Sequence, residues 1–328
     1  MTMAGGGSIL VRRKLPKTGL SALLLALATL TCASAYAQTL YKYRGADSEW
    51  SFADRPPDDG QNVEIRQMQQ RVSRAQVTVM HSLIGSEIVF VAHNGFHAPM
   101  ELALNFDAIT GVEFPHSDNS LRWVLAPKSD LTLLTLAVLG TAAPPNVKYH
   151  FAYLPGDPVA QHLPGGGYRV PFSVGSYFAV TQAYPEAVTH RTLDSQYALD
   201  VAMPVGTDVV AARGGIVFEV ASNNFRGGLN LQRDGRSANI VRILHDDGTF
   251  AIYAHLNWNS IRVRPGDRVR VGDYIADSGN TGYSSGPHLH FAVQRNSGMR
   301  VESLPIFFKG PNSGRVVPAT GDMLTAYP

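Results

Sequence analysis

Cysteine is almost missing from this sequence, since Cys32 is the only one in 328 residues. It lies inside a segment that predicts an export signal, so the mature chain is expected to contain no cysteine. Such a chain can form no disulfide, no cysteine-ligated zinc site and no thiol nucleophile. Lipidation of Cys32 is an alternative, but the preceding "TLT" is a poor lipidation box.

The export signal is predicted at residues 1–37. A positively charged region is followed by the apolar run "LSALLLALATL" at 20–30 and by the small-x-small motif "AYA" at 35–37. A membrane anchor is the alternative, but the run is short for spanning a bilayer. We therefore expect a periplasmic or secreted protein with no stable membrane insertion after cleavage.

An excess of basic residues is also missing. The signal holds four basic residues and no acidic ones, so its removal leaves 24 basic against 26 acidic residues and a net charge of about −2. Without a basic excess, nucleic acid is not an expected partner. A hydrophobic content of 45% with 16% charged residues is typical of a folded globular chain.

Helical periodicity is missing after residue 160, whereas short apolar segments separated by turn residues recur along the chain. This pattern predicts an all-β protein. The segments at 76–160 favour an immunoglobulin-like β-sandwich, and the Gly/Pro-rich stretch at 161–172 marks a boundary. The predicted parts are a signal (1–37), a small β-hairpin domain of unknown function (38–60), a linker (61–75), the sandwich (76–160), a catalytic β domain (168–310) and a C-terminal tail (311–328).

The stretch "GPHLHF" at 286–291 contains two histidines one residue apart. Because strand residues alternate faces, His288 and His290 point the same way and Leu289 points into a core. His255 in "YAHL", Asp200 in the apolar "YALDV" and His190 in "THRTLD" add further candidates. Zinc prefers histidine nitrogen and carboxylate oxygen, and a catalytic zinc site uses three protein ligands.

The motifs "DVAMPVGTDVVAARGGIV", "YAHL" and "GNTGYSSGPHLHF" resemble the lysostaphin-type, or LytM-like, zinc metallopeptidases, over about residues 168–310. The resemblance implies an antiparallel β-sheet catalytic domain that binds Zn²⁺ and hydrolyses peptide cross-links of bacterial peptidoglycan, with the peptide stems as substrate. It also implies that Asp200 and His290 are metal ligands, and that His255 and His288 are the catalytic histidines beside the bound water.

The third ligand departs from the usual family pattern. Most members place a histidine four residues before the aspartate, and here that position is Gln196. The sequence resembles a subgroup whose first histidine lies further upstream, in a Ser-His or Thr-His pair. That resemblance implies His190 as the third metal ligand, brought back by a hairpin between residues 190 and 200.

Three other functions are alternatives to a zinc peptidase: a serine hydrolase, an activator of amidases and a wall-binding protein. "GYSSG" at 282–286 matches the nucleophile elbow of serine hydrolases, but no helix follows Ser284, as that elbow requires. His245 is expected to be a turn residue without a catalytic role. A catalytically silent activator of cell-wall amidases and a wall-binding protein remain alternatives, and the retained histidines and Asp200 favour the enzyme.

Overall fold

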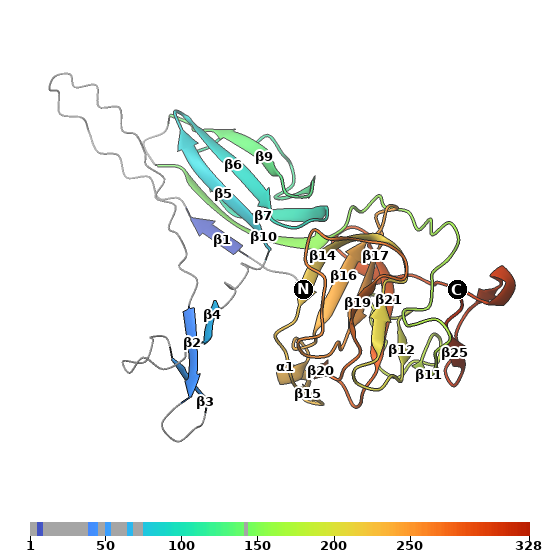
Figure 1. Cartoon of the computed structure of the whole chain (residues 1–328). Helices are drawn as coiled ribbons and strands as arrows, with labels where there is room; N and C mark the ends of the chain where they lie inside the picture. The colour runs from blue at the N-terminus through green and yellow to red at the C-terminus, as the bar shows by residue number, and fades with distance from the viewer. Residues whose placement is uncertain (1–4, 9–38, 45–49, 54–63, 68–74, 141–143) are drawn as a thin grey trace. The chain divides into compact units, whose positions relative to one another are not determined.

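The computed structural model describes residues 5–8, 39–44, 50–53, 64–67, 75–140 and 144–328 (Figure 1). Strands and loops make up nearly all of these ranges, which confirms the all-β prediction. The helical turns described are α1 (Leu231–Asp234) and η1 (Pro311–Ser313). Within the described ranges no helix has the length and hydropathy that a membrane span requires. Most of the predicted export signal lies outside the described residues.

The described strands between residues 39 and 67 belong to a compact unit of their own. In it, β2 (Thr39–Arg44) pairs antiparallel with β3 (Trp50–Ala53) and with β4 (Glu64–Gln67). The predicted hairpin at 38–60 therefore corresponds to β2 and β3. The third strand, β4, falls within the segment predicted as a linker.

Two sheets with a common core are built from one strand near the start of the chain and from strands that begin at residue 77. One consists of β5 (Val77–Ile84), β6 (Glu87–Asn94) and β9 (Asp130–Ala137); the other consists of β1 (Gly5–Ser8), β10 (Asn146–Pro155), β7 (Met100–Thr110) and β8 (Ser120–Leu125). Apolar side chains alternate inward along β6, and the ring of Phe90 packs edge-on against Phe106 of β7 at 5.6 Å. This packing is that of a two-layer sandwich. The immunoglobulin-like assignment stays a prediction.

A nine-stranded sheet forms the C-terminal part of the chain, in the order β18-β14-β16-β17-β21-β12-β11-β25, with β22 paired to β21. Its strands are β11 (Tyr177–Gln182), β12 (Leu199–Val201), β14 (Gly215–Ala221), β16 (Ile240–Leu244), β17 (Phe250–Ala254), β18 (Arg268–Val269), β21 (Leu289–Asn296), β22 (Val301–Ser303) and β25 (Met323–Thr325). Strand β25 belongs to the predicted C-terminal tail, and it pairs with β11.

Short pairs of strands complete this part: β13 (Asp208–Val210) with β19 (Tyr274–Asp277), β15 (Gly227–Gly228) with β20 (Gly282–Tyr283), and β23 (Phe308–Lys309) with β24 (Arg315–Val316). The pair β15–β20 is parallel and joins two loops that are far apart in the sequence. Gly227 is required there, because a Cβ atom would lie 2.0 Å from the carbonyl oxygen of Asn280.

The sandwich and the nine-stranded sheet are in direct contact. Phe250 of β17 and Phe218 of β14 are buried in the same apolar cluster as the sandwich core. Glu101 of β7 is buried, and its carboxylate accepts hydrogen bonds from the Asn296 side chain at 2.8 Å and the Met299 backbone N–H. A buried carboxylate needs such donors to offset the cost of desolvation.

Candidate metal centre

Three neighbouring strands bring the candidate residues together. In the sheet, β21 lies between β17 and β12, and His290 of β21 is opposite both Ala254 and Asp200. His255 directly follows Ala254, so it lies at the same end of the sheet. Leu289 is fully buried in the core of this sheet, as the alternation of "HLH" predicts.

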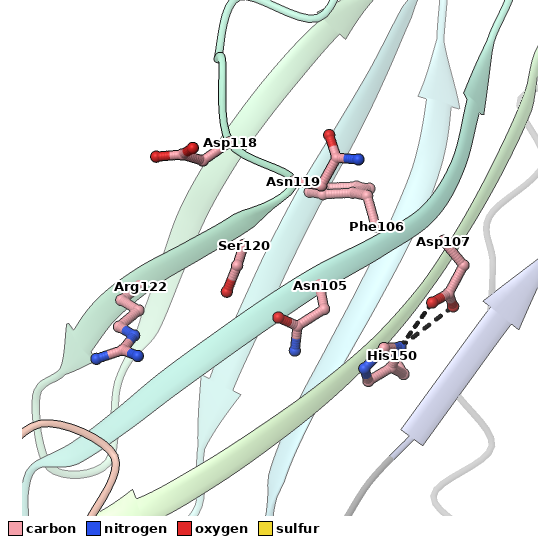
Figure 2. A pocket seen from close by; sticks show the side chains of 8 residues that line it. All are labelled: Asn105, Phe106, Asp107, Asp118, Asn119, Ser120, Arg122 and His150. Carbon is pink, nitrogen blue, oxygen red and sulfur yellow. Dashed lines mark hydrogen bonds and ion pairs between the residues drawn. The ribbon is translucent and has the colours of Figure 1, made fainter.

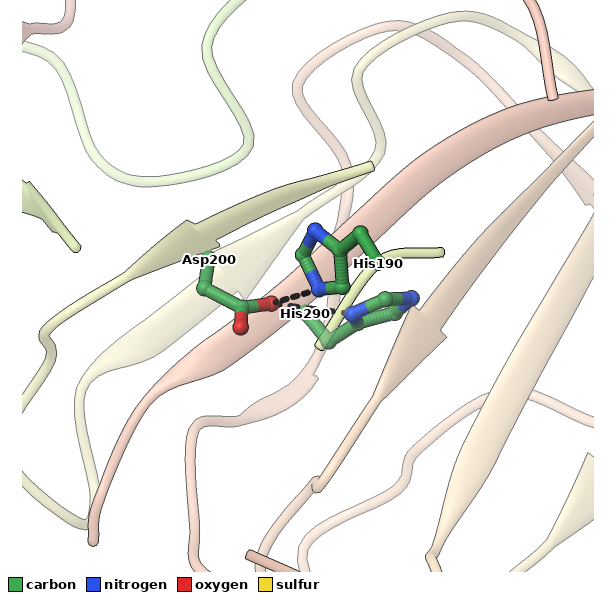
Figure 3. Close-up of side chains that lie close together, drawn as sticks. All are labelled: His190, Asp200 and His290. Carbon is green, nitrogen blue, oxygen red and sulfur yellow. Dashed lines mark hydrogen bonds and ion pairs between the residues drawn. The ribbon is translucent and has the colours of Figure 1, made fainter. Parts of the chain in front are cut away.

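His190 reaches the same place from the loop between β11 and β12. Its side chain is buried, and its Nδ1 lies 3.2 Å from the backbone carbonyl of Ala198. Since a carbonyl oxygen only accepts, Nδ1 carries a hydrogen in this contact, and Nε2 lies on the side of the ring next to Asp200. That Nε2 lies 3.2 Å from Asp200 Oδ1 (Figure 3).

His190, Asp200 and His290 form a compact cluster. Asp200 Oδ1 also lies 2.9 Å from His290 Nδ1, and the two imidazole rings meet edge to face with centroids 4.9 Å apart. One ligand atom from each residue lies within 4.8 Å of the other two. Nitrogen and oxygen ligands of a tetrahedral zinc ion lie ~3.4 Å from one another. The donor types and their spacing therefore fit a divalent metal ion.

The electrostatics of Asp200 agree with this arrangement. Burial by itself raises the pKa of its carboxyl group, but hydrogen bonds from His190 and His290 outweigh that effect and hold the pKa well below its usual range. Asp200 is therefore a carboxylate at neutral pH. A buried carboxylate beside two imidazoles offers the negative charge that a bound cation needs.

His255 lies beside this cluster at the end of β17. Its backbone adopts a left-handed conformation with φ of 61°, and its Nδ1 donates to the carbonyl of Thr281 at 2.7 Å. Its ring centroid is 5.9 Å from that of His290. Burial, followed by the nearby His288 and His290, lowers the pKa of His255 to about 3, so the ring is neutral near pH 7.

His288 packs against His255, with ring centroids 4.5 Å apart. Its Nδ1 donates to the carbonyl of Gly286 at 2.8 Å, which leaves Nε2 as an acceptor 3.8 Å from Asp200 Oδ2. Both histidines are thus held by backbone carbonyls in the same tautomer. Each presents a free Nε2 acceptor.

The sequence profile of peptidase family M23 matches residues 194–302, a range that contains Asp200, His255, His288 and His290. The chain carries an M23 peptidase domain. His190 precedes the matched range, so it lies outside the part of the chain that defines the M23 match.

Curated proteins with peptidase names are similar to part of this chain. Glycyl-glycine endopeptidase ALE-1 of Staphylococcus capitis is 38% identical over 104 residues, covering 31% of this chain and 25% of that protein. DD-carboxypeptidase/endopeptidase Mpg of Neisseria gonorrhoeae is 37% identical over 98 residues, covering 30% and 20%. An uncharacterized metalloprotease of Buchnera aphidicola is 37% identical over 95 residues, covering 29% and 22%. The matches thus span a quarter or less of these relatives' own length.

Solved structures of M23 proteins also resemble this chain. The catalytic domain of the prophage-encoded M23 protein EnpA from Enterococcus faecalis, in a mutant form, is 28% identical, with a TM-score of 0.31. The likeness covers 41% of this chain and 92% of that one.

Ser284 of the M23 domain is not arranged as a nucleophile. Its hydroxyl donates to the Gly286 carbonyl at 2.9 Å and lies 3.2 Å from His288 Nδ1. Because that nitrogen already carries a hydrogen for Gly286, it does not accept the serine proton. The loop leads into strand β21 and not into a helix. These contacts argue against a serine hydrolase.

His245 lies at the opposite end of the β16–β17 hairpin from His255. Four residue steps separate Leu244 from Ile240 on β16, about 13 Å along the strand. His245 is buried, and its Nδ1 donates to the Gly214 carbonyl at 3.0 Å. That His245 has no catalytic role stays a prediction.

Gln182 is a residue of this site that the sequence analysis missed. It is the last residue of β11, opposite Asp200 of β12, and its Nε2 donates to Asp200 Oδ2 at 2.6 Å. A strand ending in a glutamine carries no functional signal by itself. Only the pairing of β11 with β12 reveals the contact.

A pocket of about 450 Å³ lies elsewhere, on the sandwich, and Figure 2 shows its polar lining. The lining residues are Asn105, Phe106, Asp107, Asp118, Asn119, Ser120, Arg122 and His150. His150 Nδ1 is 3.0 Å from an oxygen of Asp107. This pocket shares no residue with the metal cluster, so it is not part of the candidate metal centre.

Proposed function

We propose that this chain is an exported zinc-dependent metalloendopeptidase that hydrolyses peptide cross-links of bacterial peptidoglycan. The convergence of His190, Asp200 and His290, with two further histidines beside them, carries the proposal. The names of two relatives of its M23 domain, a glycyl-glycine endopeptidase and a DD-carboxypeptidase/endopeptidase, support a peptide of the cell wall as the substrate.

Zinc is the proposed metal, held by His190, Asp200 and His290. Two imidazole nitrogens and one carboxylate oxygen form a three-ligand set of the catalytic type, which leaves one position free. When bound, zinc supplies Lewis-acid polarisation of the scissile carbonyl and of water.

His255 and His288 are the proposed proton carriers. Each ring keeps its Nδ1 hydrogen on a backbone carbonyl, so Nε2 is available to hold and orient a water molecule and to accept its proton. Once protonated, the same nitrogen becomes a donor, which stabilises the developing oxyanion or protonates the leaving amine. The fixed tautomers remove the need for ring reorientation during the reaction.

The proposed location is the periplasm or the outside of the cell, following from the predicted signal and from the cell-wall substrate. In this arrangement the peptide stems of peptidoglycan are the partner. The sandwich packs against the catalytic sheet through Phe218, Phe250 and Glu101, which supports a structural contribution of that domain to the enzyme.

The test combines zinc analysis with digestion of purified sacculi. The wild-type chain is expected to hold one zinc ion and to release soluble muropeptides, and His190→Ala is expected to lose both properties. Gln196→Ala, at the usual family position of the first ligand, is the matched control and should keep both. A wild-type protein without metal that instead stimulates a separate amidase would overturn the enzyme in favour of the activator.

A further inference from the structure

Gln182 contacts two different parts of the metal cluster with one amide group. Its Nε2 donates to Asp200 Oδ2 at 2.6 Å. Its Oε1 accepts from the backbone N–H groups of Val188 at 2.8 Å and Thr189 at 2.9 Å, and from the Thr189 hydroxyl at 3.1 Å. Thr189 directly precedes His190. The amide therefore links the aspartate to the segment that carries the first histidine.

The chemistry of this position requires an amide. The side facing Asp200 must donate, because a carboxylate only accepts, and the side facing residues 188 and 189 must accept from three donors. Glutamate would place a second negative charge against Asp200 and would have no hydrogen to donate. An apolar side chain would leave two backbone N–H groups without their acceptor.

The contact also decides which oxygen of Asp200 faces the histidines. Gln182 engages Oδ2, while Oδ1 lies 3.2 Å from His190 Nε2 and 2.9 Å from His290 Nδ1. Figure 3 shows this one oxygen joined to both rings. A carboxylate free to rotate about its last bond would present either oxygen, whereas a short hydrogen bond to Oδ2 holds one orientation.

We propose that Gln182 is a positioning residue of the metal centre. It holds the Asp200 carboxylate with Oδ1 toward the cluster and fixes the segment before His190, so that two of the three ligands depend on it. This inference rests on the metal centre proposed above. Partners that orient metal ligands typically contribute about 10- to 100-fold in metal affinity.

The experiment measures zinc affinity of the metal-free full chain by competition with a chromophoric chelator, together with the visible spectrum of the cobalt-substituted protein. Gln182→Glu and Gln182→Met are the test variants, and the second keeps the side-chain volume without adding charge. Both are expected to bind zinc about 10- to 100-fold more weakly and to change the cobalt spectrum.

Gln294→Met is the matched control. Gln294 is buried, its Nε2 donates to the Asp194 carbonyl at 2.7 Å in the same loop, and among the described residues it makes no hydrogen bond to His190, Asp200 or His290. It is expected to lower the urea midpoint while leaving zinc affinity within about threefold and the cobalt spectrum unchanged. This control separates loss of loop anchoring from loss of ligand orientation.

Two outcomes overturn the inference, and they differ. If the Gln182→Met variant folds, binds zinc as tightly as the wild type and gives the same cobalt spectrum, the positioning role alone is overturned. A wild-type chain that binds no zinc overturns the proposed metal centre, and the role of Gln182 with it.

Discussion

Asp200 and His290 lie directly opposite one another on adjacent antiparallel strands, and Asp200 Oδ1 is 2.9 Å from His290 Nδ1. The contact therefore depends on the register of β12 against β21. A slip of one residue would turn either side chain to the other face of the sheet, since successive strand residues alternate faces. The buried neighbours Leu199, Val201 and Leu289 oppose such a slip, because it would expose them.

Asp200→Asn is expected to weaken zinc binding by on the order of 100-fold or more, because the neutral amide removes the charge of the ligand set. The measurement is competitive zinc titration of the purified chain. Asp208→Asn, at an exposed aspartate of β13, serves as the control and should bind like wild type. Equal affinities of the two variants would exclude Asp200 as a ligand.

His255→Ala and His288→Ala are each expected to keep the zinc and to lower kcat by about 10²- to 10⁴-fold, as expected for groups that move protons. Muropeptide release from sacculi measures the rate, and metal analysis measures occupancy. His116→Ala, an exposed histidine of the sandwich region, should leave both unchanged. Loss of zinc in either test variant would instead make that histidine a ligand.

Metal removal is expected to destabilise the wild-type protein. At free zinc of 100 times Kd, binding stabilises the fold by about 2.7 kcal/mol, so a chelator should lower Tm by roughly 5–10 °C. Differential scanning calorimetry with and without chelator measures the shift. Asp200→Asn should show a much smaller decrease in Tm on addition of the chelator. A wild-type Tm that is the same with and without chelator would contradict a bound metal.

Stability should depend on pH through His245. Burial lowers the pKa of His245 to about 4, whereas the unfolded chain has an ordinary value near ~6.5. Between these values the unfolded state binds a proton that the folded state does not, so the free energy of unfolding rises with pH and levels off above the upper value. The full change from pH 7 to pH 4 is about 3 kcal/mol.

His245→Asn is the variant that isolates this effect. Asparagine can still donate to the Gly214 carbonyl, and His245 Nε2 has no hydrogen-bond partner among the described residues. Urea unfolding from pH 4 to 8 should show the wild type losing stability faster than the variant as the pH falls. If the free energy of unfolding of the two proteins falls equally with pH, the result would contradict a buried neutral imidazole at His245.

Ser284→Ala distinguishes the metallopeptidase from a serine hydrolase. Ser284 contacts His288 Nδ1 and the Gly286 carbonyl, so its loss is expected to change kcat by less than about tenfold. Loss of a nucleophile would reduce kcat by a factor of roughly 10⁶. The measurement compares kcat for digestion of sacculi by the wild type and by Ser284→Ala at equal zinc content.

Local features of the site followed from the sequence because they depend on short-range geometry. The two-residue period of a strand placed His288 and His290 on one face and Leu289 in the core. An Asp-Gly pair is typical of tight hairpin turns, and the pair at 247–248 lies in the turn between β16 and β17, where Gly248 adopts a positive φ of 80°. Length and spacing of the apolar segments gave the all-β class.

By itself, then, the sequence determined the class of fold, the faces of the strands and the residue types able to bind a metal. Tertiary structure decided which strands are neighbours, that the 183–198 loop returns His190 to Asp200, and that Gln182 holds both. The physical reason is that strand pairing and loop closure join residues far apart in the chain, and their geometry depends on the packing of the whole core. A local pattern carries no information about that packing.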